Sequence, residues 1–252
     1  MRKLRGIPFV ALLLLVFGFQ KNPGAQGTTL IIQFRVFIHG EPLLLNKKYK
    51  NPFGETFEIS RFRFYAGKIA PVYADTTLKI NISPAYHLID FSDSASTAIK
   101  LSAPAGTYSG IQFQLGVDSI DQYRGAQSGD LDPIKGMFWT WNSGYLSFKI
   151  EGYSPVSNQP AQVIAYHIGG FRYPYNTVWK IRLDSTNDVP FQVSGENKIT
   201  IEVAMELDNF FDSTNPLHIN EISSCTTPGL LAEKISENFT GIFAGLTIRN
   251  YP

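Results

Sequence analysis

Alternating apolar and polar residues recur along the chain and predict a series of short β-strands. In the first run, every second residue from Leu30 to Ile38 is apolar, with Gln33 and Arg35 between them. Successive side chains of a strand point to opposite faces, so this pattern buries one face and exposes the other. Comparable runs cover 56–59, 62–73, 78–82, 86–91, 105–117, 139–141, 145–150, 163–168, 178–183 and 199–207. The predicted fold is mainly β, an antiparallel β-sandwich of about ten strands.

The pattern changes near the C-terminal end, where apolar residues recur at helical spacing. Thr227 is a favourable N-cap, and Pro228 fits the first position of a helix. Apolar residues then follow at Leu231, Ile235, Phe239, Ile242 and Phe243. The sequence therefore predicts one amphipathic helix over about 228–245, packed on the sheets.

The first residues have the composition of a secretion signal. Arg2, Lys3 and Arg5 precede an apolar stretch at 7–19 that is too short to span a bilayer comfortably. We therefore assign residues 1–26 to a signal peptide and 27–252 to a single domain that is periplasmic or secreted. No later segment is apolar enough to cross a membrane, so we expect no membrane span after cleavage.

Charge and missing motifs exclude several classes of function. The chain has 22 basic and 21 acidic residues and a net charge of +1, without the basic stripe that nucleic-acid binding requires. It also lacks a phosphate-binding loop, a His-Glu-x-x-His helix, a Cys-x-x-Cys pair and a Gly-x-Ser-x-Gly turn, so we expect a non-enzymatic protein. Cys225 is the single cysteine, which leaves no internal disulfide and indicates either a metal ligand or a small buried residue.

Candidate chemistry gathers in two segments. Trp139 and Trp141 are two residues apart on a predicted strand, so they share a face, with Met137 beside them. His167 is followed by Gly169 and Gly170, which let other groups approach the backbone closely. Indole, thioether and imidazole groups together would favour copper over magnesium or calcium. Two alternatives remain open for the tryptophans: packing in the core, or a surface that stacks against a glycan or another small ligand.

The histidines and a polar loop give further candidates. The histidines are His39, His87, His167 and His218, which are far apart in sequence, so only folding could unite two or three of them around copper or zinc. Each could instead be a hydrogen-bonded structural side chain. The loop at 118–136 is rich in aspartate, and its length is typical of functional loops. Its carboxylates are explained either by calcium binding or by ordinary turn chemistry.

Several motifs in a fixed order resemble one known family. They are Phe62-Arg63-Phe64-Tyr65, Tyr86-His87-Leu88-Ile89-Asp90, Gly116-Val117-Asp118, Gly129-Asp130-Leu131-Asp132-Pro133, Gly136-Met137-Phe138-Trp139-Thr140-Trp141-Asn142-Ser143-Gly144-Tyr145, Tyr166-His167-Ile168-Gly169-Gly170 and the helical segment 231–239. Together they resemble the MbnP-like copper-binding family, in particular its Bacteroidetes-type members. The resemblance covers nearly the whole chain after the signal peptide.

This resemblance implies a periplasmic or secreted protein that handles copper. In the better-known members of the family and in analogous methanotroph copper proteins, a tryptophan is oxidised to kynurenine, and the new aromatic amine joins histidines as a copper ligand. The resemblance implies a di-haem peroxidase-like partner for that oxidation. The matching positions here are Trp139 or Trp141 as the oxidised residue and His167 as a ligand. His87 and His39 are candidates for a further imidazole, and Met137 is a candidate soft neighbour of the metal. Unlike the methanotroph members, which carry several cysteines, this chain has one.

Overall fold

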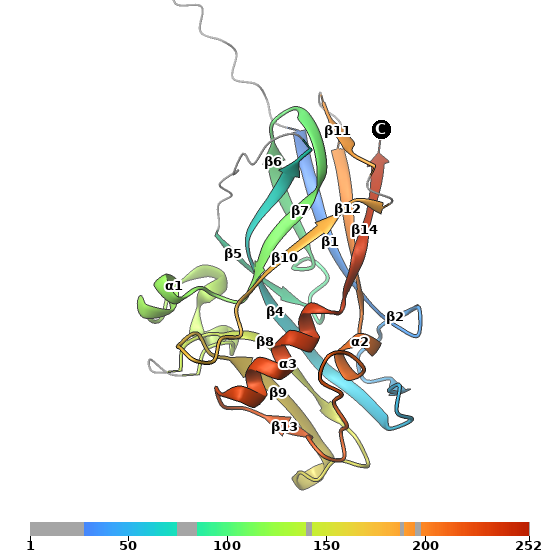
Figure 1. Cartoon of the computed structure of the whole chain (residues 1–252), viewed down its shortest axis with the longest axis vertical. Helices are drawn as coiled ribbons and strands as arrows, with labels where there is room; N and C mark the ends of the chain where they lie inside the picture. Colours follow the sequence, from blue (N-terminus) through green and yellow to red (C-terminus); the bar gives the residue numbers. More distant parts are fainter. Residues whose placement is uncertain (1–27, 75–84, 140–142, 187–188, 195–197, 252) are drawn as a thin grey trace, which may run out of the picture.

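Two β-sheets pack face to face and enclose the main hydrophobic core (Figure 1). The computed structural model of the chain describes residues 28–74, 85–139, 143–186, 189–194 and 198–251. The smaller sheet consists of β1 (Thr28–Ile38), β2 (Glu41–Pro42), β6 (Ala98–Ala103), β12 (Lys198–Glu206) and β14 (Phe243–Tyr251). The predicted fold class, a mainly β sandwich, is confirmed.

In the described part of the chain, the larger sheet contains nine strands and carries the candidate site residues Trp139 and His167 on or beside it. Its strands are β3 (Lys48–Lys50), β4 (Thr56–Tyr73), β5 (Tyr86–Asp90), β7 (Gly106–Leu115), β8 (Leu146–Tyr153), β9 (Val163–Gly169), β10 (Trp179–Asp184), β11 (Phe191–Val193) and β13 (Ser224–Cys225). Pairing is mostly antiparallel, as predicted. In addition, each sheet has one parallel pair, β1 with β12 and β9 with β13.

Strand β4 connects the two halves of the larger sheet, and Figure 1 shows it running along most of the molecule. Its first part, from Glu58 to Phe64, pairs with β8, and its second part, from Ala66 to Tyr73, pairs with β7. The sequence predicted two strands here. They form one, because the irregularity between Ile59 and Arg61 shifts the register without ending the strand.

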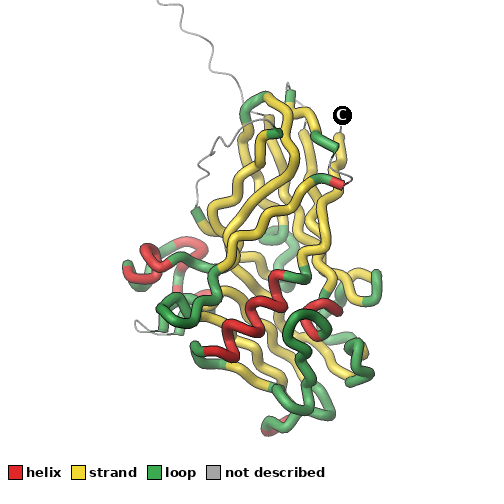
Figure 2. Tube along the Cα trace, viewed as in Figure 1, coloured by secondary structure: helices red, strands yellow, loops and turns green. Residues whose placement is uncertain are grey.

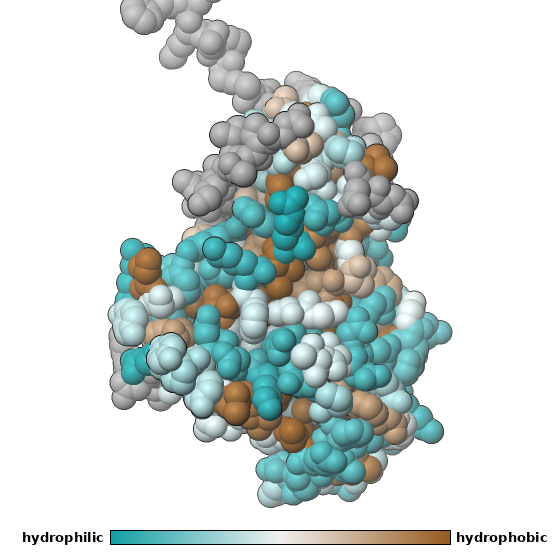
Figure 3. Space-filling view, in the orientation of Figure 1, coloured by the Kyte–Doolittle hydropathy of each residue, from teal (hydrophilic) through white to brown (hydrophobic). Residues whose placement is uncertain are grey.

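Aromatic side chains fill the core between the layers. Phe34 of β1 contacts Phe64 and Phe113 of the facing sheet, with ring centroids 5.3 and 5.7 Å apart. Helix α3 (Leu230–Thr240) covers the inner face of β8 and β9 (Figure 2), where Phe239 stacks on Phe148 at 3.9 Å. Such contacts add to the apolar burial that stabilises the fold. On the molecular face in Figure 3, apolar surface is scattered among polar residues.

Short helices complete the fold. They are α1 (Ser119–Tyr123), α2 (Asp208–Phe211), and the 3-10 turns η1 (Gly129–Leu131), η2 (Pro133–Lys135) and η3 (Pro160–Gln162). Within the described ranges, no helix is both long and apolar enough to span a membrane.

Several element boundaries differ from the prediction. The C-terminal helix ends at Thr240, because Phe243 and Leu246 belong to β14 and point into the core. Strands β2, β3, β6, β11, β13 and β14 were not predicted. Most of the predicted strand at 139–141 lies outside the described residues; next to it, Phe138 and Tyr145 form an isolated bridge. The signal peptide at 1–26 and the strand at 78–82 lie outside the described residues.

Candidate metal-binding face

The segment between β7 and β8 folds over the outer face of the larger sheet. It encloses a second, smaller hydrophobic cluster, in which Met137, Tyr145 and Tyr65 are fully buried. The Tyr145 hydroxyl donates to the carbonyl of Leu131 at 2.8 Å, and the Gln122 side chain accepts from the Tyr145 backbone N–H at 2.6 Å. The aspartate-rich loop therefore packs against the sheet as a cover.

A short hairpin in this cover presents Trp139. The Trp139 N–H donates to the carbonyl of Gly144 at 3.0 Å, and the Leu146 N–H donates to the carbonyl of Met137 at 2.9 Å. Trp139 is half-buried against the small cluster. Trp141 lies outside the described residues. The hairpin thus fixes one of the two candidate tryptophans at the edge of the cover.

The Trp139 indole rests on the strand that carries His167. A Cβ atom at Gly169 would lie 3.1 Å from Cζ3 of Trp139 and 2.9 Å from the carbonyl oxygen of Tyr145. Only glycine therefore leaves room for the ring, as the sequence led us to expect. Gly169 and His167 are two residues apart in β9, so the indole lies on the same face of the strand as the imidazole.

Glu151 holds the His167 imidazole. Nε2 of His167 lies 2.8 Å from Oε1 of Glu151, on the neighbouring strand β8. The hydrogen bond from His167 is the main reason that the pKa of Glu151 falls to about 2; burial opposes this fall, and Lys149 reinforces it. An ionised carboxylate can only accept, so Nε2 of His167 carries the hydrogen. In a neutral imidazole, Nδ1 is then the nitrogen with a free lone pair.

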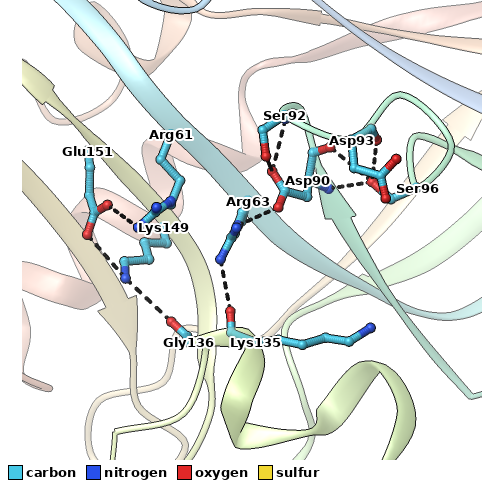
Figure 4. Close-up of polar contacts among 10 residues, drawn as sticks. All are labelled: Arg61, Arg63, Asp90, Ser92, Asp93, Ser96, Lys135, Gly136, Lys149 and Glu151. Atoms are coloured by element: carbon cyan, nitrogen blue, oxygen red, sulfur yellow. Dashed lines mark hydrogen bonds and ion pairs between the residues drawn. The ribbon is translucent and has the colours of Figure 1, made fainter.

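A charged network connects Glu151 to the tryptophan hairpin (Figure 4). Lys149 lies 3.1 Å from Glu151 and donates to the carbonyl of Gly136 at 3.4 Å, while Arg61 binds the other carboxylate oxygen at 2.8 Å. Gly136 adopts the left-handed conformation that ends η2, immediately before Met137. The same carboxylate therefore orients His167 and, through Lys149, helps to hold the start of the hairpin.

A second ion pair extends this network along the cover. Arg63 lies 2.7 Å from Asp90 and donates to the carbonyl of Lys135 at 2.9 Å. Lys135 in turn pairs with Asp130 at 2.6 Å, and Asp130 accepts from the backbone N–H of Leu88. The pairing registers place His167, Lys149, Arg63 and Asp90 on four successive strands. A ladder of charged groups thus crosses the outer face of the sheet.

His87 lies away from His167, at the edge of the sandwich. It pairs with Ala66 of the inner face, whereas His167 shares the outer face with Arg63. Three strand spacings, roughly 14 Å, separate their strands. Nε2 of His87 is buried without a hydrogen-bond partner, and burial lowers the pKa of the imidazole.

The other two histidines also lie elsewhere. His39 follows β1, where Nε2 is 2.8 Å from the carbonyl of Lys50 and Nδ1 is 3.4 Å from Asp208. His218 stacks against Phe53 at 3.9 Å. Among the described residues, no group of three His, Cys, Asp or Glu side chains could hold a metal ion. The structure brings Trp139, Met137 and His167 to one region, and it does not bring His87 or His39 to them.

The remaining candidates have structural partners. Cys225 is 5% exposed, and its Sγ lies 3.9 Å from the carbonyl of Thr227. In the loop, Asp118 caps α1 and pairs with Lys68, while Asp132 accepts from the N–H of Ile134. For the loop at 118–136 the sequence left calcium binding and ordinary turn chemistry open. The contacts of Asp118 and Asp132 are turn and capping contacts.

The sequence pattern did not identify Glu151, Lys149 and Arg63 as residues of the site. Their signal was visible in the alternation Phe62-Arg63-Phe64 and Lys149-Ile150-Glu151, which places charged residues on the outer face of two strands. Outward charges are usually solvated, so the pattern alone does not show that they pair across strands under a cover.

Comparisons with known proteins agree on one family. The family model MbnP matches residues 27–227, which is most of the chain. Among solved structures, MbnP from Methylosinus trichosporium is similar, with a TM-score of 0.59 and 15% identity over 90% of this chain and 100% of that chain. At this identity the likeness shows the fold alone. A search of curated proteins finds no match. By its family match over residues 27–227, the chain belongs to the MbnP family.

Proposed function

We propose that this chain is a periplasmic or secreted copper-handling protein without catalytic activity of its own. The proposed copper site lies on the outer face of β9, where Nδ1 of His167 supplies one nitrogen ligand and Trp139 lies beside it. Imidazole nitrogen is a good ligand for copper, and Glu151 holds the ring through its other nitrogen. Membership of the MbnP family supports copper over other metals.

One observation carries the proposal: the ring of Trp139 packs against the face of β9 from which the His167 side chain projects. Gly169, which receives the indole, is two residues from His167, a separation of about 7 Å along a strand. The buried thioether of Met137 lies in the cluster beneath the hairpin. The position therefore combines an imidazole and an oxidisable ring in one place.

The unmodified chain offers an incomplete set of ligands, and this fits a site completed by oxidation. The described part of the chain has one imidazole on this face and no group of three metal-ligating side chains. Conversion of Trp139 to kynurenine would break the C2–C3 bond of the indole with the addition of two oxygen atoms, giving N-formylkynurenine, and hydrolysis would then release the formyl carbon as formate. The net change is the loss of one carbon and the gain of one oxygen, and the indole nitrogen becomes an aromatic amine. That amine would be the second nitrogen ligand. A di-haem peroxidase-like partner would supply the oxidising equivalents, as the family resemblance implies.

Titration with Cu(I) tests the site. In protein isolated from cells with its natural partner, so that the tryptophan is modified, we expect His167→Gln to weaken Cu(I) binding at least tenfold, while His87→Gln and His39→Gln bind as the otherwise unchanged protein does. Each control variant also removes one imidazole, so it measures how much Cu(I) binding falls when a histidine outside the proposed site is lost. A loss confined to His87→Gln would assign copper to the edge of the sandwich, and equal binding by all four proteins would remove the metal proposal.

Intact-mass measurement tests the modification separately. Protein isolated from cells with its natural partner should differ from recombinant protein by the loss of one carbon and the gain of one oxygen. Trp139→Phe should abolish this change, whereas retention in Trp139→Phe and loss in Trp141→Phe would move the modification to Trp141. The alternative function, glycan or small-ligand binding at the tryptophan face, predicts glycan binding that is lost in Trp139→Ala.

A further inference from the structure

A pocket of about 490 Å³ opens at the edge of the sandwich, away from His167. It lies between β5, the turn that follows β5, the start of β6, and the segment η1–η2. Leu88 and Ile99 give it apolar walls, and the highly exposed Ile134 stands at its rim. A volume of this size is typical of a site for a small organic molecule rather than for a bare ion.

Most charged groups in the pocket already have partners. Arg63 pairs with Asp90, and Lys135 pairs with Asp130, so these four groups balance one another. Asp93 and His87, which also line the pocket, have no such ionic partner in the described part of the chain. Asp93 takes part in no ion pair within the described part of the chain; it accepts from the backbone N–H of Ala95 at 3.0 Å. The pocket lining therefore carries one uncompensated negative charge.

The other exceptional group is His87. Its Nε2 atom is buried and has no hydrogen-bond partner among the described residues, although the residue lines the pocket. A buried polar atom without a partner destabilises the folded state, so such an atom needs an explanation. Burial lowers the pKa of His87 and favours the neutral ring, whose unprotonated nitrogen accepts a hydrogen bond. A bound donor would satisfy it.

We propose that this pocket is a second binding site, which takes a small organic ammonium compound: Asp93 pairs with its positive charge, and Nε2 of His87 accepts from a further N–H or O–H group. An anion is disfavoured because both cationic side chains in the lining are already paired. A metal ion is disfavoured because no set of three metal-ligating side chains occurs among the described residues. The site does not include the proposed copper ligand, because His167 is not part of the pocket lining and lies three strands away from His87.

Binding of three small molecules of similar length tests the charge that the pocket selects. Putrescine carries two ammonium groups, butanediol carries hydroxyl groups in the same positions, and succinate carries carboxylates. We expect putrescine to bind the copper-free full chain at least tenfold more tightly than butanediol, and succinate not to bind, as measured by calorimetry. Backbone amide shifts on putrescine addition should centre on β5 and on the turn containing Asp93.

Two variants test the residues. Asp93→Asn changes an exposed turn residue and should leave the thermal midpoint unchanged while weakening putrescine binding about tenfold or more, the loss expected for a charge-assisted contact. His87→Gln should weaken it similarly. Asp212→Asn and His39→Gln, which lie elsewhere, are the matched controls and should bind normally.

The proposal is overturned by any of three results: no putrescine binding at millimolar concentration, equal or stronger binding of butanediol or succinate, or binding that survives both Asp93→Asn and His87→Gln. These outcomes are separate from those of the copper titration, because no copper is present and the proposed copper ligand is unchanged.

Discussion

The two faces of β8 and β9 are built from alternate residues of the same strands, yet one face carries aromatic packing and the other carries ion pairs. On the inner face, Phe148 stacks on Phe239 of α3, and Tyr166 contacts Phe210 at 5.5 Å. On the outer face, Lys149 and His167 share the carboxylate of Glu151. The inner face is filled with rings, whereas the outer face is filled with charges under a loop.

The difference shows how stability and candidate function are divided within one sheet. Rings on the inner face are removed from water and stabilise the fold through buried area. Ion pairs on the outer face contribute less net free energy, because desolvation offsets much of their attraction. They instead fix positions: Glu151 orients His167, and Lys149 holds the backbone at Gly136. Substitutions on the two faces should therefore separate stability from ligand binding.

The largest expected effect is on the inner face. Phe148→Ala removes a fully buried ring and should lower the free energy of unfolding by about 3–5 kcal/mol. Urea denaturation followed by tryptophan fluorescence measures this loss. Copper bound per folded molecule should stay the same under stabilising conditions, because the outer face is untouched. Weakened copper binding by folded Phe148→Ala protein would contradict the assignment of stability to the inner face and ligand binding to the outer face.

A smaller loss of stability, with a larger loss of binding, is expected on the outer face. Glu151→Gln leaves Lys149, which is 12% exposed, without its anion and should cost about 1–3 kcal/mol. Loss of the carboxylate behind His167 should weaken Cu(I) binding about 10- to 100-fold. Glu41→Gln is the control, since the exposed pair of Glu41 with Lys47 spans 3.7 Å. If the two variants behave alike, Glu151 has no special role.

Lowering the pH should reduce the stability of the protein through protonation of the Glu151 carboxylate. The pKa of Glu151 in the folded protein is about 2, below its usual value of 4.5. Its stabilising contribution is therefore complete above pH 4.5 and is lost as the pH falls from 4.5 toward 2. The unfolding midpoint of the unchanged protein should drop more steeply across this range than that of Glu151→Gln. Parallel curves would show that the ion pair does not contribute.

The smallest expected effect concerns His87. Burial lowers its pKa, so the unfolded chain binds a proton more readily than the folded chain, and stability should fall as the pH drops below about 6.5. His87→Gln should flatten the stability curve between pH 7 and pH 5. Urea midpoints at a series of pH values measure the slope, and an unchanged slope in His87→Gln would refute the assignment.

The sequence predicts the inner face much better than the outer face. Alternation identifies β1, β4 and β12, because apolar residues on one side of a strand have few other uses. It misses β14, since Ile242 and Phe243 continue the spacing of the preceding helix. The ladder from His167 to Asp90 depends on the register of four strands, which side-chain alternation does not determine. For the same reason, alternation does not predict that His87 and His167 lie on strands far apart in the sheet.

The most direct test of the copper proposal follows the four imidazoles as Cu(I) is added. Nitrogen-15 NMR of the histidine rings distinguishes Nδ1 from Nε2, and Cu(I) is diamagnetic, so the signals remain visible. Before addition, His167 should carry its hydrogen on Nε2. On addition, the Nδ1 signal of His167 should shift while those of His39, His87 and His218 stay in place. A shift at His87 or His39 with His167 unmoved would contradict the proposed site.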